Sequence, residues 1–279
     1  MADSEDSKSA ATTPMRQERG QVTVDSHALE TLRIHPAGEH EPGAPTLVFL
    51  HEGVGSVSLW RDFPLQVCAR TGLSGLVYSR YGYGQSAVLA AARDPRYMHH
   101  EGQVVLPQLL AKLDISAPHL LGHSDGGSIA LIHAGSAYPV RSLTLLAPHV
   151  FVETISIAGI EEAREVFNRS DELATRLARH HRDPVATFRG WNDIWLHPDF
   201  RNWNIENLLP AISAPVLLIQ GEDDHYGTMA QLDAIERQVS GPCRQLRLAD
   251  CGHNPHRDQA SATLQAIGEF LQDNAARPA

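Results

Sequence analysis

Residues 119–135 read HLLGHSDGGSIALIHAG, a short apolar run that passes through a glycine-bounded turn into a segment of helical spacing. This pattern predicts a strand, a sharp turn and a helix, with Ser124 at the apex of the turn. Gly122 and Gly126 stand two residues before and two residues after the serine. A turn this tight presses the backbone against its neighbours, so these positions need small residues and the serine is strained. The stretch is therefore interpreted as a G-x-S-x-G nucleophile elbow.

On both sides of the elbow, strand-like runs alternate with segments of helical spacing. Four runs are apolar throughout, as expected for strands covered on both faces: TLVFL (46–50), GLVYS (75–79), SLTLL (142–146) and VLLIQ (216–220). Four further runs complete the predicted strands: 21–24, 29–34, 119–121 and 245–248. Helices are expected at 59–71, 98–113, 127–138, 228–239 and 261–274. The alternation predicts an α/β fold, a mostly parallel eight-stranded sheet with helices on both faces.

The alternation stops between residues 147 and 214. This interval holds EEAREVFNRSDELATRLARHH (161–181), which has helical spacing, and then Trp191, Trp195 and Trp203. We expect a helical lid or cap insertion at 147–214 on a core of 21–146 and 215–279, preceded by a disordered polar tail at 1–20. The tryptophans either pack the insertion against the core or contact a substrate.

Composition excludes several classes of function. The 279 residues carry 23 Lys+Arg against 33 Asp+Glu, a net charge of −10, and the basic residues are scattered, which disfavours nucleic-acid binding. No run of about 18 uncharged apolar residues occurs, so no membrane role is expected. The N-terminal residues resemble no signal peptide, and the three cysteines have no CxxC spacing, so a reducing cytoplasmic location without disulfide framework or zinc site is predicted.

A serine hydroxyl becomes a useful nucleophile only when a base removes its proton, and that base is usually held by an acid. Both residue types follow the elbow. VLLIQGEDDHYG (216–227) ends a predicted strand with three acids, and LADCGHNPHRD (248–258) places His253 on a loop after the last strand. The order Ser, Asp, His is that of the α/β-hydrolases.

Given these motifs, the chain from about residue 21 to 272 resembles the α/β-hydrolase fold superfamily. The resemblance implies that the acid is Asp224, three residues after the glycine that closes its strand. It also implies that His253 is the base and that His256 is a structural neighbour.

The oxyanion of an acyl-transfer intermediate needs two backbone N–H donors. One is expected from Asp125, the residue after the nucleophile. The loop HEGVGS (51–56) resembles the family pattern H-G-x-x-x-S, which implies Gly53 as the second donor. Glu52 stands where the family has glycine, and it is read either as a solvated carboxylate or as a pocket residue. The substrate-pocket candidates are Glu52, His123, Trp191 and Trp195.

The resemblance implies a serine hydrolase that cleaves a small carboxylic ester or lactone through an acyl-enzyme on Ser124, with no cofactor and no metal. A C–C bond hydrolase, an amino-acid-ester or amide hydrolase, and a non-catalytic small-molecule receptor stay open as alternatives. The expected partner is a small-molecule substrate, and a homo-oligomer is left open. If the side chains of Glu52 and Asp125 face the pocket, the substrate is neutral or cationic near the scissile bond; otherwise they turn away or cap a helix.

Overall fold

The structure, a computed structural model, describes residues 13–37 and 46–274. Its sheet has eight strands in the order β1-β2-β4-β3-β5-β6-β7-β8. The strands are β1 (Met15–Val24), β2 (His27–Pro36), β3 (Thr46–Leu50), β4 (Ser74–Tyr78), β5 (His119–His123), β6 (Ser142–Leu146), β7 (Val216–Gly221) and β8 (Cys243–Leu248). β1 pairs antiparallel with β2, and β2 pairs antiparallel with β4, whereas the other neighbours are parallel. The predicted α/β class and mostly parallel sheet are confirmed.

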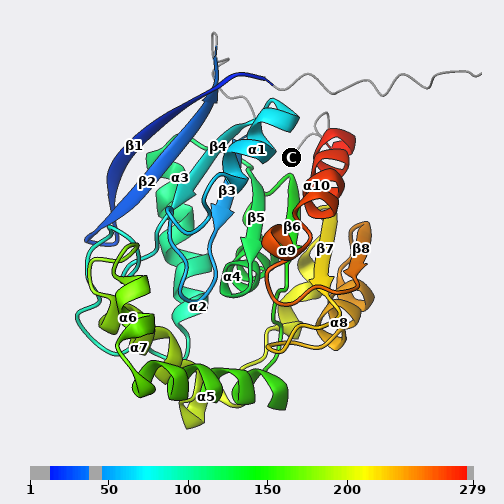
Figure 1. The fold of residues 1–279 in the computed structure, drawn as a ribbon. Coiled ribbons are helices and arrows are strands. Elements are labelled where there is room, and N and C mark those ends of the chain that lie inside the picture. The colour runs from blue at the N-terminus through cyan, green and yellow to red at the C-terminus, as the bar shows by residue number, and fades with distance from the viewer. Residues whose placement is uncertain (1–12, 38–45, 275–279) are drawn as a thin grey trace, which may run out of the picture.

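Two hydrophobic clusters cover the two faces of the sheet, because successive side chains of a strand point to opposite faces. In β3, Val48 and Leu50 join one cluster, and Leu47 and Phe49 join the other. Helices α2 (Tyr97–His100), α3 (Leu106–Lys112), α4 (Asp125–Gly135) and α8 (Ala230–Gln238) bury residues in the first cluster, with the π-helical turn η1 (Glu101–Val105) between α2 and α3. Helices α1 (Phe63–Thr71) and α10 (Ala260–Asn274) cover the second face (Figure 1).

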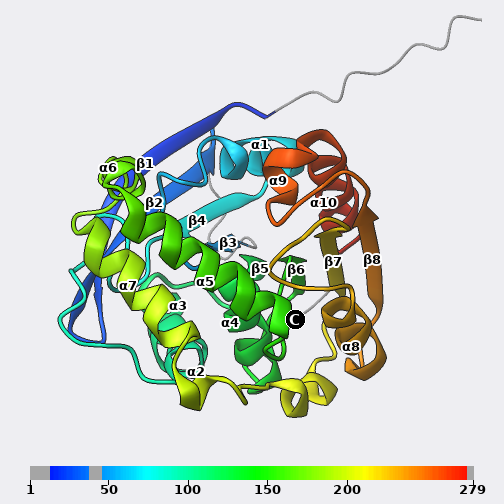
Figure 2. The same ribbon diagram turned by 60° about the horizontal axis from the view of Figure 1, so that its bottom comes forward.

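The chain between β6 and β7 folds into helices α5 (Thr154–Arg169), α6 (Glu172–Leu177) and α7 (Pro184–Trp195), followed by the short 3₁₀ turns η2 (Pro198–Phe200) and η3 (Glu206–Ala211). Helices α5 and α7 run side by side across one end of the sheet (Figures 1 and 2). Phe167 of α5 and Phe188 of α7 stack with ring centroids 3.9 Å apart, which fixes the pair. Within the described residues, no helix is both long and apolar enough to span a bilayer.

One prediction about the N-terminus is wrong. The disordered tail was expected to reach residue 20, but β1 begins at Met15 and pairs with β2 over its whole length, from Met15 opposite Pro36 to Val24 opposite His27. β1 is an edge strand whose side chains are mostly exposed, so its sequence needs no apolar alternation. Residues 1–12 of the predicted tail lie outside the described residues.

Candidate active site

The predicted elbow has a strained backbone at Ser124. This residue connects β5 to α4 with φ 52° and ψ −120°, a conformation that costs energy for a residue with a Cβ. Its N–H donates to the carbonyl of Leu146 at 2.9 Å. A Cβ added to Gly126 would lie 2.1 Å from the carbonyl oxygen of Leu50, so only glycine allows α4 to approach β3 this closely. Ser124 thus stands at the carboxyl end of a central strand, where open α/β sheets bind their ligands.

His253 and Asp224 lie together after the last two strands. His253 Nδ1 is 2.9 Å from Oδ1 and 2.8 Å from Oδ2 of Asp224, and the N–H of Tyr226 donates to Oδ1 at 2.8 Å. Burial raises the pKa of Asp224, but the charge and hydrogen bond of His253 outweigh it, and the pKa is lowered overall. Among the described residues, none forms a hydrogen bond with Ser124 Oγ, and such catalytic contacts often close only when substrate binds.

The loop that carries Gly53 is held from two sides. The indole of Trp191 packs against the backbone of Gly53, where an added Cβ would lie 2.1 Å from Nε1. The guanidinium of Arg80 donates to the carbonyls of His51 and of Glu52, the latter at 3.0 Å. Arg80 has no exposed surface. Arg80 is not among the residues that the sequence analysis identified, so the part this arginine plays in fixing the predicted oxyanion loop was missed.

The side chain of Asp125 is fully buried and already bound. Its Oδ2 accepts from the hydroxyl of Tyr97 at 2.7 Å, and its Oδ1 accepts from Trp195 Nε1 at 3.1 Å. Arg80 Nη2 lies 3.9 Å from Oδ2. Each oxygen therefore already accepts a hydrogen bond inside the protein, and the expectation that this carboxylate sets the charge of the substrate stays a prediction. The role of the Asp125 N–H as an oxyanion donor stays a prediction.

His123, a predicted pocket residue, points away from the pocket instead. Its Nε2–H donates to the carbonyl oxygen of His253 at 2.8 Å, so the elbow holds the histidine loop. Its Nδ1 lies 3.6 Å from Oε2 of Glu52. The ring of His256 packs 5.2 Å from Trp60, and burial lowers the pKa of His256 to about 3, which fits the expected structural part.

A pocket of about 480 Å³ opens over the elbow and contains Ser124 and His253 in its wall. Glu52, Trp191 and Trp195 also line it, as the sequence analysis expected, although their contact with substrate stays a prediction. Helices α5 to α7 supply a large part of the wall. Trp195 also packs against Trp203, with ring centroids 6.3 Å apart, and its Nε1–H donates to Asp125 of the core at 3.1 Å.

His149 lines this pocket and was not predicted. It follows β6, packs 5.2 Å from Trp195 and is 2% exposed. Burial lowers the pKa of His149 to about 3, so the ring is neutral at physiological pH. Its place at the carboxyl end of a central strand was the signal that could have identified it.

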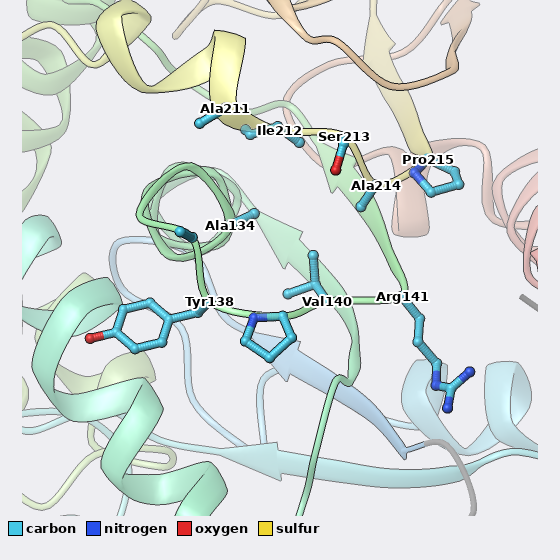
Figure 3. Close-up of a pocket in the computed structure, with 11 residues that line it drawn as sticks. Ala134, Tyr138, Val140, Arg141, Ala211, Ile212, Ser213, Ala214 and Pro215 are labelled. Atoms are coloured by element: carbon cyan, nitrogen blue, oxygen red, sulfur yellow. The ribbon is translucent and has the colours of Figure 1, made fainter. Parts of the chain in front are cut away.

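A second pocket, of about 550 Å³, lies at the opposite end of the sheet (Figure 3). Val140 and Arg141 border it just before β6, and Ala214 and Pro215 just before β7. Among the described residues, no histidine and no carboxylate line it. Its hydroxyl groups, those of Tyr138 and Ser213, therefore have no histidine or carboxylate beside them in the pocket wall to act as a base, in contrast to Ser124. The described chain also holds no group of three His, Cys, Asp or Glu side chains suited to a metal ion.

Known proteins resemble the chain over most of its length. Residues 47–266 match the model of the alpha/beta hydrolase family. The chain belongs to that family. The 2-succinyl-6-hydroxy-2,4-cyclohexadiene-1-carboxylate synthase of Salmonella paratyphi C (strain RKS4594) is 23% identical to this chain, over 83% of this chain and 96% of its own. Proline iminopeptidase of Lactobacillus delbrueckii subsp. bulgaricus is 24% identical over 84% and 92%.

The fold of this chain is also found in solved structures. The enol-lactonase from Burkholderia xenovorans LB400 superposes with a TM-score of 0.69 and 18% identity, covering 90% of this chain and 99% of that one. At this identity the likeness shows the fold alone, so the residues of the site rest on the geometry above.

Proposed function

We propose that this hydrolase cleaves a small carboxylic ester or lactone through an acyl-enzyme on Ser124. The observation that carries the proposal is the Asp224–His253 pair, in which Nδ1 of His253 lies 2.8 Å from Oδ2 of Asp224. The pair stands beside a pocket whose wall contains both Ser124 and His253. Asp224 accepts from Nδ1–H, which leaves Nε2 of the neutral ring with a lone pair for the serine proton.

In the proposed reaction, Ser124 Oγ attacks the ester carbonyl carbon while its proton passes to Nε2 of His253. The N–H groups of Gly53 and Asp125 stabilise the oxyanion. The C–O bond then breaks, and His253 returns the proton to the leaving alkoxide. Water next attacks the acyl carbon by the same route, giving the acid and free Ser124. Asp224 stabilises the imidazolium in both halves.

The helices between β6 and β7 have a part in this proposal. Residues 147–214 act as the lid of the pocket, with α7 contributing Trp191 and Trp195 to the wall. These two side chains shape the acyl site by excluded volume, because each carries a large rigid ring.

The test is a screen of activated esters, lactones, thioesters, amides and C–C substrates on the wild type, Ser124→Ala and His253→Ala. Hydrolysis of an ester or lactone by the wild type, with nearly complete loss in both variants, is expected because nucleophile and base act as a unit. Turnover above about a tenth of wild type in Ser124→Ala contradicts the assignment. Ligand binding without any turnover favours the receptor alternative.

A further inference from the structure

The mouth of the active-site pocket is ringed by arginines. Arg61, Arg176, Arg179 and Arg257 all line it, and all four are exposed. They come from both sides of the opening: Arg61 from the loop before α1, Arg257 from α9 (Pro255–Asp258), and the other two from α6 and the residues after it. We call this set the arginine rim. It gathers positive charge at one place on a chain whose net charge is −10.

In the described residues, no carboxylate forms an ion pair with the arginine rim. Within the described chain, the ion pairs of arginine involve other residues, such as Arg244 with Asp273. Arg257 donates only to a backbone carbonyl, that of Leu59, at 2.8 Å. The two carboxylates in the pocket wall, Glu52 and Asp125, lie at its inner end beside the elbow.

The ring of His180 lies within reach of the positive charge of the arginine rim. It lies at the mouth, where its Nδ1 is 2.9 Å from the hydroxyl of Ser58. Partial burial and the charges of Arg61, Arg179 and Arg257 lower the pKa of His180. Three of the four rim arginines, Arg61, Arg179 and Arg257, are therefore close enough to act on one charge at the same time.

The wall of the pocket holds charged, polar and apolar side chains. Besides the rim, its wall includes apolar side chains such as Val54, Ile160 and Leu177, together with polar ones such as His149 and Ser156. A substrate that fills this space meets Glu52 and apolar side chains in the wall, and a cationic mouth. Guanidinium groups bind carboxylate and phosphate in planar, bidentate geometry.

We propose that the arginine rim binds an anionic group, carboxylate or phosphate, at the end of the substrate remote from the scissile carbonyl. This inference rests on the proposed function, since it assigns the substrate class of the same site. The substrate is then an ester with an apolar acyl chain that ends in an anion. The pocket is concave and holds about 480 Å³, which suits a small molecule.

The test compares four 4-nitrophenyl esters of equal chain length: hexanoate, the adipate monoester, 5-phosphonopentanoate and 5-trimethylammoniopentanoate. The adipate ester, the phosphonate ester or both should exceed hexanoate in kcat/KM, with the trimethylammonium ester lowest. The preference should shrink as NaCl rises from about 50 mM to about 0.5 M, because exposed charges are screened. The anionic ester with the higher kcat/KM shows whether the substrate carries a carboxylate or a phosphate.

Variants of the arginine rim separate this proposal from a general charge effect. Arg176→Gln and Arg179→Gln should each lower the ratio of kcat/KM for anionic over neutral ester by about 1.5- to 5-fold, the range of exposed ion pairs. Arg169→Gln is the matched control, since Arg169 is an exposed arginine at the end of α5 outside the pocket wall. It should leave both the ratio and the hydrolysis of hexanoate unchanged.

Two outcomes overturn the proposal and are distinct from failure of the hydrolase function. Hydrolysis of all four esters at equal kcat/KM, insensitive to both rim variants, removes the anion site and leaves the triad intact. If no ester is hydrolysed, calorimetry of monomethyl adipate, 5-phosphonopentanoate and methyl hexanoate on Ser124→Ala decides independently of turnover. Tighter binding of an anion that weakens in Arg176→Gln supports the rim, and equal binding of all three overturns it.

Discussion

The substitution Asp224→Asn isolates the part of the acid from that of its neighbours. In the structure, the N–H of Tyr226 donates to Oδ1 of Asp224 at 2.8 Å. An asparagine carbonyl would keep that bond, so its NH₂ would face Nδ1 of His253. Nδ1 must then accept a hydrogen bond, and the ring proton moves to Nε2. That tautomer cannot take the proton of Ser124.

The expected loss in kcat follows the triad precedent for an acid changed to its amide, roughly 10⁴-fold. At about 1.4 kcal/mol per factor of ten, this is about 5 kcal/mol of transition-state stabilisation. Asp223→Asn is the matched control. Asp223 is exposed, and its contact in the turn is a backbone N–H that donates to Cys251 at 3.0 Å, which the substitution retains. We expect its kcat to stay near that of wild type.

The assay is steady-state release of 4-nitrophenol from the best ester, with thermal unfolding of each variant as a check on folding. Since an isosteric amide changes no packing, both variants should melt as cooperatively as wild type. A kcat for Asp224→Asn within about ten-fold of wild type would refute the assignment of the acid. A larger loss in Asp223→Asn would move the assignment by one residue.

Three other expectations concern packing, positioning and pH. Gly126→Ala should lower the free energy of unfolding by about 2 to 3 kcal/mol, because its Cβ would lie 2.1 Å from the backbone oxygen of Leu50; Gly20→Ala, with 3.3 Å to a side-chain oxygen, should cost far less in the same urea titration. His123→Phe removes the 2.8 Å bond to the carbonyl of His253 and should lower kcat by about 3- to 10-fold with KM nearly constant; an unchanged kcat means that the bond positions nothing. Burial lowers the pKa of His133 from 6.5 to about 4, so between these values the unfolded chain binds a proton that the folded chain does not, and stability falls as the pH drops. His133→Gln should lower the slope of unfolding free energy against pH by up to about 1.4 kcal/mol per pH unit near about pH 5. His197→Gln, at an exposed site, should leave that slope unchanged. Equal slopes in the two variants would reject the burial argument.

The sequence predicts the sheet well because its central strands are buried on both faces. Runs such as TLVFL and VLLIQ must be apolar throughout, and this signal survives without any homologue. β1 was missed over residues 15–20 because an edge strand with exposed side chains carries no such constraint. Its order comes from pairing with β2, a non-local contact that local pattern cannot reveal.

The site was predictable where residues are consecutive and unpredictable where they meet through folding. The elbow around Ser124 follows from local spacing, and the resemblance to the α/β-hydrolases implies the acid after β7. The side-chain directions of Asp125 and His123 do not, because they depend on Tyr97, Trp195 and the histidine loop, which are distant in sequence. The arginine rim was overlooked for the same reason, since scattered arginines gather only when α6 and α9 meet at the pocket.

Covalent labelling tests the central claim most directly. Diethyl 4-nitrophenyl phosphate transfers its phosphoryl group to an activated serine with release of 4-nitrophenol, and the product is stable enough for peptide mapping by mass spectrometry. We predict a single diethylphosphoryl group on Ser124, formed much more slowly in Asp224→Asn and absent in Ser124→Ala. Label on a different residue, or an unlabelled protein that hydrolyses esters as well as before, would contradict the acyl-enzyme on Ser124.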